Sequence, residues 1–209
     1  MNSHQIGRLG AFTAGAATLL FAVSMLIPAK SLSVPLSSGI SIFISFGYIL
    51  MTCGLAATAG QERKGCAFAA AAFAVTYAAM ICLVYYTQLT TVPQQAASLE
   101  LLDALTYKPG TWMFNLDMLG YGLLSISTIF AGLSIAVQTR EDTWLRRLLL
   151  IHGVFAPACL VFPVLGVLFS QGAGAASSDL FGVLVLEFWC VYFLPVTILF
   201  ARHMKRQKQ

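Results

Sequence analysis

The chain has 209 residues, of which 58% are hydrophobic and only 10% are charged, and its formal net charge is +4. A soluble domain usually carries about 25% charged residues, so this composition excludes a soluble globular protein. The positive charge does not indicate nucleic-acid binding, because the basic residues lie beside apolar runs, where lipid head groups and membrane topology explain them. The lipid bilayer is therefore the first expected partner, and no nucleic acid is expected.

Six apolar runs recur along the chain, each of roughly the twenty residues that a helix needs to cross about 30 Å of hydrocarbon. Each run must be helical, because hydrocarbon offers the backbone no hydrogen-bond partners. The sequence therefore predicts an all-α integral membrane protein, a six-transmembrane-helix bundle that forms one domain over residues 1–209. The predicted spans cover residues 9–28, 40–59, 66–86, 113–137, 148–169 and 180–201.

The distribution of Lys and Arg predicts the orientation of this bundle. With the N-terminus in the cytoplasm, all of the 12 basic residues except Lys30 and Lys108 fall on the cytoplasmic side. This positive-inside pattern predicts that both termini are cytoplasmic. The short loops and the lack of extramembrane domains indicate the cytoplasmic membrane of a bacterium.

The connection between the third and fourth spans is the one long loop. Within it, residues 93–107 are predicted to form a short amphipathic helix, since Leu99, Leu102 and Leu105 recur every three residues. Pro93 suits the first turn of such a helix. We expect this helix to lie flat on the outer interface or to cover the end of the bundle. An ordinary folded connector is the alternative.

The fourth span carries an acidic residue, Asp117, inside its outer third. A carboxylate at membrane depth is costly unless it faces a partner or water, so by default it marks a functional site. Tyr121, Ser125 and Thr128 follow Asp117 on the same helical face and continue it into a stripe of hydroxyl groups. The second span has a similar polar row that includes Tyr48.

The sixth span contributes a second acid, Glu187, at a similar outer depth. We predict that the two acids line a polar pocket that opens to the outer face. Two carboxyl groups in a low dielectric tend to share a proton, which suits proton-coupled transport or cation binding. The residues predicted to bind a ligand or carry a proton there are Asp117, Glu187, Tyr121, Asn115, Tyr48, Tyr85, Tyr86 and Gln88.

The function predicted from this pocket is the binding or transport of a small molecule or ion. The alternative is a structural or accessory membrane subunit, in which Ser, Thr or Tyr hydroxyls bond to each acid and fix helix registry. A third class is an intramembrane lipid-modifying enzyme with Asp117 or Glu187 as general base. The sequence favours the enzyme least, because no nucleophile, metal set or phosphate-binding cluster accompanies the acids.

The sequence contains no pattern that predicts a cofactor or a metal site. No lysine lies inside a predicted span, which excludes a retinal Schiff base, and haem or zinc would need more nitrogen ligands than the 3 histidines supply. His152 is expected at a cytoplasmic membrane edge, Trp189 as an interface or packing aromatic, and the 5 cysteines as small core residues. We therefore predict no catalytic residue, no cofactor and no metal, and leave a protein partner or homo-oligomer open.

Overall fold

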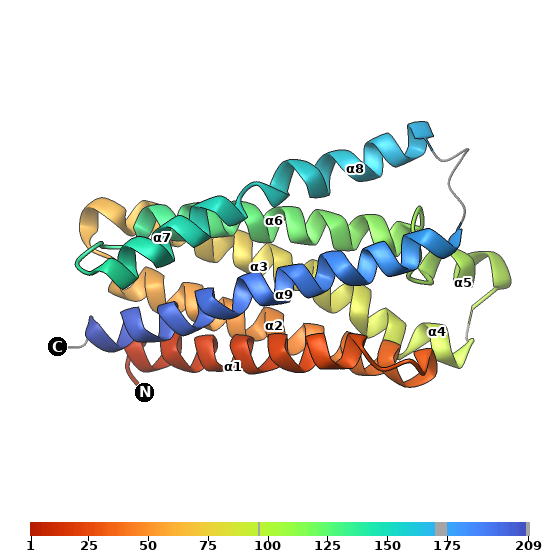
Figure 1. The fold of residues 1–209 in the computed structure, drawn as a ribbon, viewed down its shortest axis with the longest axis horizontal. Helices are drawn as coiled ribbons and strands as arrows, with labels where there is room; N and C mark the ends of the chain where they lie inside the picture. The colour runs from red at the N-terminus through yellow and green to blue at the C-terminus, as the bar shows by residue number, and fades with distance from the viewer. Residues whose placement is uncertain (96, 170–174, 208–209) are drawn as a thin grey trace.

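The computed structural model describes residues 1–95, 97–169 and 175–207. Over these ranges the chain is a bundle of long helices that run side by side along one axis, with no strand among them (Figure 1). Six helical segments are long and apolar enough to cross a membrane, which confirms the predicted all-α architecture. In chain order the helices are α1 (Ser3–Met25), α2 (Lys30–Thr58), α3 (Gln61–Leu89), α4 (Thr91–Gln94), α5 (Leu99–Leu105), α6 (Trp112–Ser134), α7 (Arg140–His152), α8 (Phe155–Phe169) and α9 (Ala175–Arg206).

The fifth span consists of two helices, and the first of them begins well ahead of its apolar run. Thr139 and Asp142 form a capping box, in which Thr139 Oγ1 accepts a hydrogen bond from the Asp142 N–H and Asp142 Oδ2 accepts one from the Thr139 N–H. Such a cap starts a helix in polar sequence, and a turn at Gly153 then separates α7 from α8. His152, which was expected as an interfacial residue at a cytoplasmic membrane edge, is the last residue of α7 and is buried in the bundle, with 1% of its surface exposed.

The loop between α3 and α6 does not form the single helix predicted over residues 93–107. It contains two short helices, because Gln95 adopts a left-handed backbone conformation, with φ at 49°, and ends α4. The chain re-enters a helix after Ser98, whose side chain accepts a hydrogen bond from the Leu101 N–H. The predicted extent is therefore wrong, and the second helix is confined to α5.

Glycines bring α1 and α2 into backbone contact. A Cβ atom added at Gly10 would lie 2.4 Å from Met51 N and 2.6 Å from Gly47 O. One added at Gly54 would lie 2.5 Å from the Gly7 Cα. Membrane helices associate through packing of this kind, since lipid supplies no hydrophobic drive to hold them together. Close helix approach therefore explains the glycines of these two spans.

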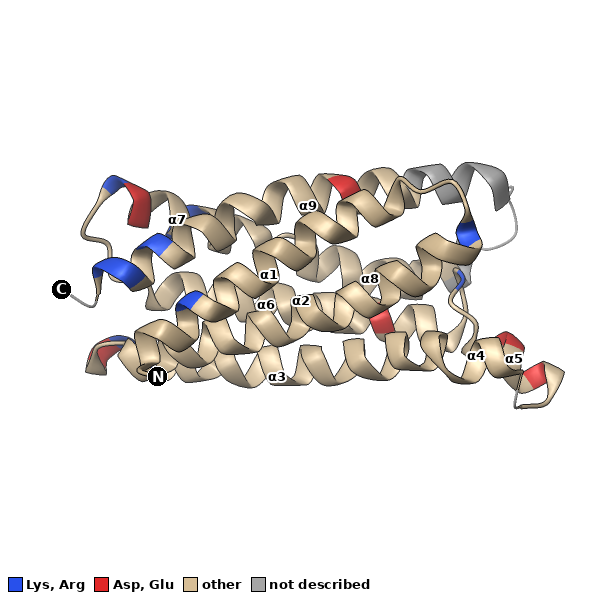
Figure 2. Ribbon diagram, turned by 90° about the horizontal axis from the view of Figure 1, so that it is seen from below, with Lys and Arg blue, Asp and Glu red and all other residues tan. Residues whose placement is uncertain are grey.

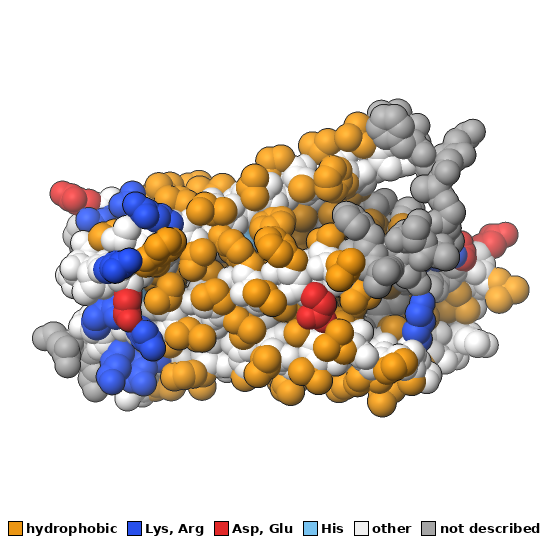
Figure 3. All heavy atoms as spheres, viewed as in Figure 1, with side chains coloured by type: hydrophobic (Ala, Val, Ile, Leu, Met, Phe, Trp, Pro, Cys, Tyr) orange, Lys and Arg blue, Asp and Glu red, His pale blue; other side chains and the backbone are white. Residues whose placement is uncertain are grey.

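Most of the charged residues gather at the ends of the bundle (Figure 2). Both marked ends of the chain lie at one end, and most Lys and Arg residues lie there too (Figures 1 and 2). Figure 3 shows apolar side chains over the face between this basic end and the opposite end. An apolar band between charged ends suits a bilayer.

An ion-pair network joins α7 to α9 at the basic end. Asp142 Oδ1 accepts hydrogen bonds from His203 Nδ1 at 2.8 Å and from Arg206 Nη2 at 2.6 Å. The Asp142 and His203 side chains are only 2% and 4% exposed. Glu141 pairs with Arg206 and, at 2.7 Å, with Arg202. The start of α7 is thereby held against the last turns of α9.

Candidate functional site

Asp117 lies in the first half of α6, and its carboxyl group is buried among tyrosines. The residue is 2% exposed. Its Oδ2 accepts a hydrogen bond of 2.7 Å from the Tyr107 hydroxyl and a longer one of 3.4 Å from the Tyr85 hydroxyl. The other oxygen, Oδ1, is also buried and has no hydrogen-bond partner. No cationic side chain forms an ion pair with Asp117 within the described ranges.

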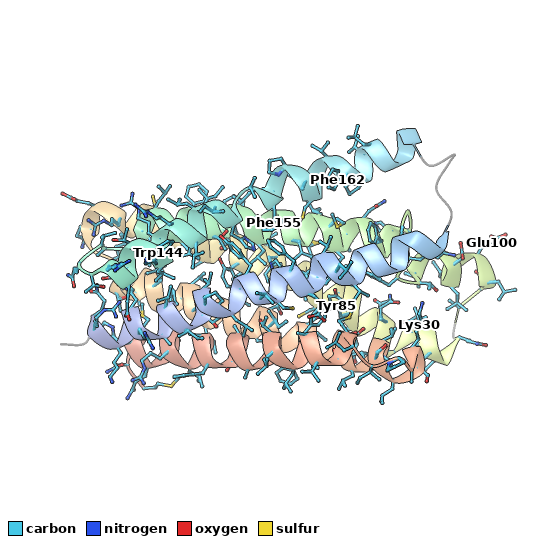
Figure 4. All side chains as sticks on the ribbon, in the orientation of Figure 1. Lys30, Tyr85, Glu100, Trp144, Phe155 and Phe162 are labelled. Atoms are coloured by element: carbon cyan, nitrogen blue, oxygen red, sulfur yellow. The ribbon has the colours of Figure 1, made fainter. Side chains whose placement is uncertain are left out.

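The tyrosines around Asp117 come from three different parts of the chain. Tyr85 belongs to α3, Tyr107 to the loop and Tyr121 to α6. The rings of Tyr85 and Tyr107 stack with centroids 6.1 Å apart, and the Tyr121 ring packs against Tyr77 of α3 with centroids 6.0 Å apart. Figure 4 places Tyr85 in the body of the bundle, between the ends marked by Glu100 and Trp144. The acid therefore sits where α3, α6 and the loop meet.

Tyr107 was not among the residues predicted for the site. It follows the amphipathic stretch in a loop, and nothing in its spacing relates it to the face of α6. Burial, together with the charge of Asp117 and the hydrogen bond to it, raises the pKa of the Tyr107 phenol well above its ordinary value. The phenol is thus held as a donor to the carboxyl group.

Gln88 fixes Tyr107 in this position. Its Nε2 donates a hydrogen bond of 2.7 Å to the Leu105 carbonyl, and its Oε1 accepts one of 3.0 Å from the Tyr107 N–H. Gln88 is 6% exposed, and both polar atoms of its side chain are used in these two bonds to the loop backbone. Gln88 was predicted to bind a ligand or carry a proton directly. It does not hydrogen-bond Asp117, and instead holds the backbone of Tyr107, which donates the shorter of the two hydrogen bonds to the acid.

Three further predicted residues lie outside the cluster around Asp117. Tyr86 is 63% exposed and Asn115 is partly exposed, and neither side chain hydrogen-bonds another described residue. Glu187 on α9 is partly exposed, and its buried Oε1 has no hydrogen-bond partner. Among the described residues, no hydrogen bond joins Glu187 to Asp117. No hydrogen bond among the described residues therefore supports the predicted pairing of Asp117 and Glu187 in one pocket.

Tyr48 and the hydroxyl stripes serve the packing of the helices. The Tyr48 hydroxyl hydrogen-bonds Ser127 Oγ at 3.0 Å, and Ser127 in turn donates to the Ala70 carbonyl at 2.6 Å. Ser125 and Thr128 donate to carbonyls of their own helix, at 2.9 Å and 2.7 Å. Such local bonds satisfy a hydroxyl without a ligand, so the stripes do not form a continuous polar channel.

A second polar group lies at the break between α7 and α8. The Trp189 Nε1–H donates a hydrogen bond of 3.0 Å to His152 Nε2, so this nitrogen carries no proton. The proton of the neutral ring is then on Nδ1, which faces Thr128 Oγ1 at 3.0 Å. Trp189, expected as an interface or packing aromatic, thus fixes the tautomer of a buried histidine.

A cavity of about 110 Å³ lies between α6, α8 and α9, beside the point where the Tyr121 and Trp189 rings meet with centroids 5.9 Å apart. Tyr121, His152 and Trp189 contribute to its wall, together with Phe155 and Cys159 of α8. Over the part of the chain that the structure covers, no cluster of three His, Cys, Asp or Glu residues could hold a metal ion.

No protein-family model, curated protein or solved structure matches this chain.

Proposed function

We propose that this protein binds a proton or a small cation at Asp117 and couples that binding to transport across a bilayer. One observation carries the proposal: the buried carboxyl group of Asp117 has one oxygen that accepts two tyrosine hydrogen bonds and one oxygen without a partner. A buried carboxylate without a counter-charge is strongly unfavourable. A proton or a cation on Oδ1 supplies the missing partner.

The proposed orientation places this site toward the outside of a bacterial cytoplasmic membrane. Support comes from the end of the bundle that carries both termini, where most Lys and Arg residues gather (Figure 2). By the positive-inside rule that end faces the cytoplasm. Asp117 is nearer to the other end, since it follows the loop and lies in the first half of α6. The loop containing α4 and α5 then lies on the outer side of the site.

A structural role for Asp117 is the second candidate, because its carboxyl group ties α3 and the loop to α6 through Tyr85 and Tyr107. In that role Asp117 needs only to accept the two tyrosine hydrogen bonds, and the negative charge of its carboxylate is not required. The substitution Asp117→Asn separates the two functions, since the amide oxygen can still accept from the tyrosines while the group can no longer take up a proton or pair with a cation.

The first test measures the thermal stability of the purified full chain in detergent, with NaCl, KCl and choline chloride at matched ionic strength and over a range of pH. A ligand at 100 times its Kd stabilises the folded protein by about 2.7 kcal/mol. We expect the wild type to respond to one of the small cations or to protons, and Asp117→Asn to lose that response. Glu187→Gln is the matched control and should respond as the wild type does.

The second test measures transport in liposomes that contain the full chain and a trapped pH-sensitive dye, with imposed proton, sodium or potassium gradients. Flux in the wild type and its loss in Asp117→Asn would support transport. An Asp117→Asn variant that folds, responds to cations and pH, and conducts as the wild type does would leave only the structural role. Loss of response in Glu187→Gln alone would move the site to α9.

A further inference from the structure

The cavity between α6, α8 and α9 has walls that can offer an occupant almost no hydrogen bonds. Ser125 Oγ already donates to the Tyr121 carbonyl, and the Trp189 N–H already donates to His152. The remaining His152 nitrogen faces Thr128. The rest of the wall is largely aromatic and aliphatic, including Phe155 and Val185. A cavity whose polar groups are already paired does not hold water well, so an apolar occupant fits it best.

The cavity opens toward the side of the bundle. It is not fully enclosed, and Val185 of α9, one of the residues that line it, is 43% exposed. The neighbouring surface is apolar on both helices, with Leu184 and Phe188 of α9 and Phe162 of α8 each more than half exposed. The cavity lies close to the middle of α6, since Tyr121 and Ser125 of that helix contribute to its wall. In a bilayer this opening faces acyl chains.

The volume of the cavity limits what can fill it. At about 110 Å³ it is smaller than the roughly 150 Å³ apolar cavity that holds one benzene molecule in another protein. It therefore has room for a few carbon atoms only, and an occupant larger than this continues out through the opening. A linear hydrocarbon chain meets both conditions, and filling the cavity regains dispersion contacts that empty space forfeits.

We propose that the cavity between α6, α8 and α9 is a lateral binding site for the acyl chain of a membrane lipid, whose terminal carbons rest against Trp189. The site is separate from Asp117 and does not depend on the proposed transport function. Tyr121 is the residue that the two sites share, since it lines the cavity and lies in the tyrosine group around the acid.

Trp189 makes the proposal testable by fluorescence. The protein has 3 tryptophans. Trp112 and Trp144 are 60% and 48% exposed, whereas Trp189 is 7% exposed and lines the cavity. A full-length chain carrying Trp112→Phe and Trp144→Phe leaves Trp189 as the only tryptophan. This protein would be reconstituted in phosphatidylcholine vesicles whose acyl chains carry bromine, a contact quencher, at different positions along the chain.

We expect Trp189 to lose fluorescence in brominated lipid, most strongly with bromine near the chain end. Val185→Phe and, separately, Cys159→Leu narrow the cavity from α9 and α8 and should each restore the fluorescence. Val191→Phe is the matched control, because Val191 lies on the same helix, is 69% exposed and does not line the cavity. It should leave the quenching unchanged. A narrowing variant whose thermal stability equals that of the parent is folded, and its quenching can be compared with that of the parent.

Three results would overturn the proposal. The first is a Trp189 that brominated chains do not quench at all. The second is equal quenching in the parent, in whichever narrowing variant folds and in Val191→Phe, because the bromine would then act from lipid outside the cavity. The third is quenching by bromobenzene but not by brominated lipid, which would assign the cavity to a small aromatic molecule.

Discussion

The Tyr107 hydroxyl donates a hydrogen bond of 2.7 Å to Asp117 Oδ2, and so joins a loop residue to a carboxyl group inside a span. The acid has phenols as its partners, where the sequence suggested a second carboxyl group. The loop is consequently part of the candidate site. Any motion of the loop that withdraws Tyr107 changes the surroundings of Asp117.

The Tyr107→Phe substitution removes this hydrogen bond and keeps the ring. A hydrogen bond to a charged group contributes roughly 1.5–3 kcal/mol, so we expect the free energy of unfolding to fall by about 2 kcal/mol. Reversible unfolding in mixed micelles measures this change. Tyr86→Phe is the control, because Tyr86 is 63% exposed and should change stability by less than about 0.5 kcal/mol. Equal effects of the two substitutions would argue against a structural role for the bond.

The stability of the protein should depend on Tyr107 at alkaline pH. Burial first, and then Asp117, raise the pKa of Tyr107 well above the ordinary value of 10.0. The phenol therefore loses its proton in the unfolded chain before it does so in the folded chain, and its contribution is complete below pH 10 and is lost as the pH rises further. The stability difference between wild type and Tyr107→Phe should shrink by up to about 1.4 kcal/mol per pH unit above about pH 10. A difference independent of pH would contradict this.

The Gln88→Ala substitution should loosen the loop while leaving α3 intact. It removes the partners of two backbone groups, the Leu105 carbonyl and the Tyr107 N–H. The loss of two such bonds costs about 1–3 kcal/mol. Amide hydrogen exchange should become faster at Tyr107. Gln94→Ala, at an exposed position, is the control, and equal protection of Tyr107 in both variants would be the contrary result.

The ion-pair network between α7 and α9 should contribute strongly to stability. Asp142→Asn leaves His203 and Arg206 without their buried carboxylate, and the loss of hydrogen bonds to a charged group costs about 1.5–3 kcal/mol. Asp103→Asn is the same change in an exposed pair with Lys108, where we expect about 0–1 kcal/mol. Thermal unfolding of both variants checks the contrast. A mild effect of Asp142→Asn would mean that water replaces the lost charge.

A glycine in the contact between α1 and α2 and a glycine outside it should have opposite effects on the free energy of unfolding when each is replaced by alanine. Gly10→Ala forces a Cβ atom against the backbone of α2 and should cost about 1–3 kcal/mol or more. Gly65→Ala, in α3 with nothing within 4 Å of the added atom, should stabilise the protein by about 0.5–1 kcal/mol. Unfolding free energies in mixed micelles measure both. A Gly10→Ala variant as stable as the wild type would show that the close approach of the two helices is not tight.

Local pattern was enough to predict the six helices, because each span is set by its own run of apolar residues. It also marked Asp117, since a carboxyl group in an apolar run stands out whatever surrounds it. The boundaries were less accurate where short-range polar contacts decide them. The capping box at Thr139 lengthens the fifth span, and the left-handed Gln95 interrupts the predicted loop helix.

The sequence by itself determined that the chain forms six helices able to cross a membrane and that one of them buries an acid. Only the tertiary structure decided what the acid meets. Whether Glu187 or a tyrosine faces Asp117 depends on the rotation of each helix about its axis, which close packing between helices fixes. The position of Tyr107 depends on the path of an irregular loop, and that of His152 on where α7 starts. Hydropathy carries none of this information, because it records how apolar a residue's neighbours along the chain are and not which residues approach it through space.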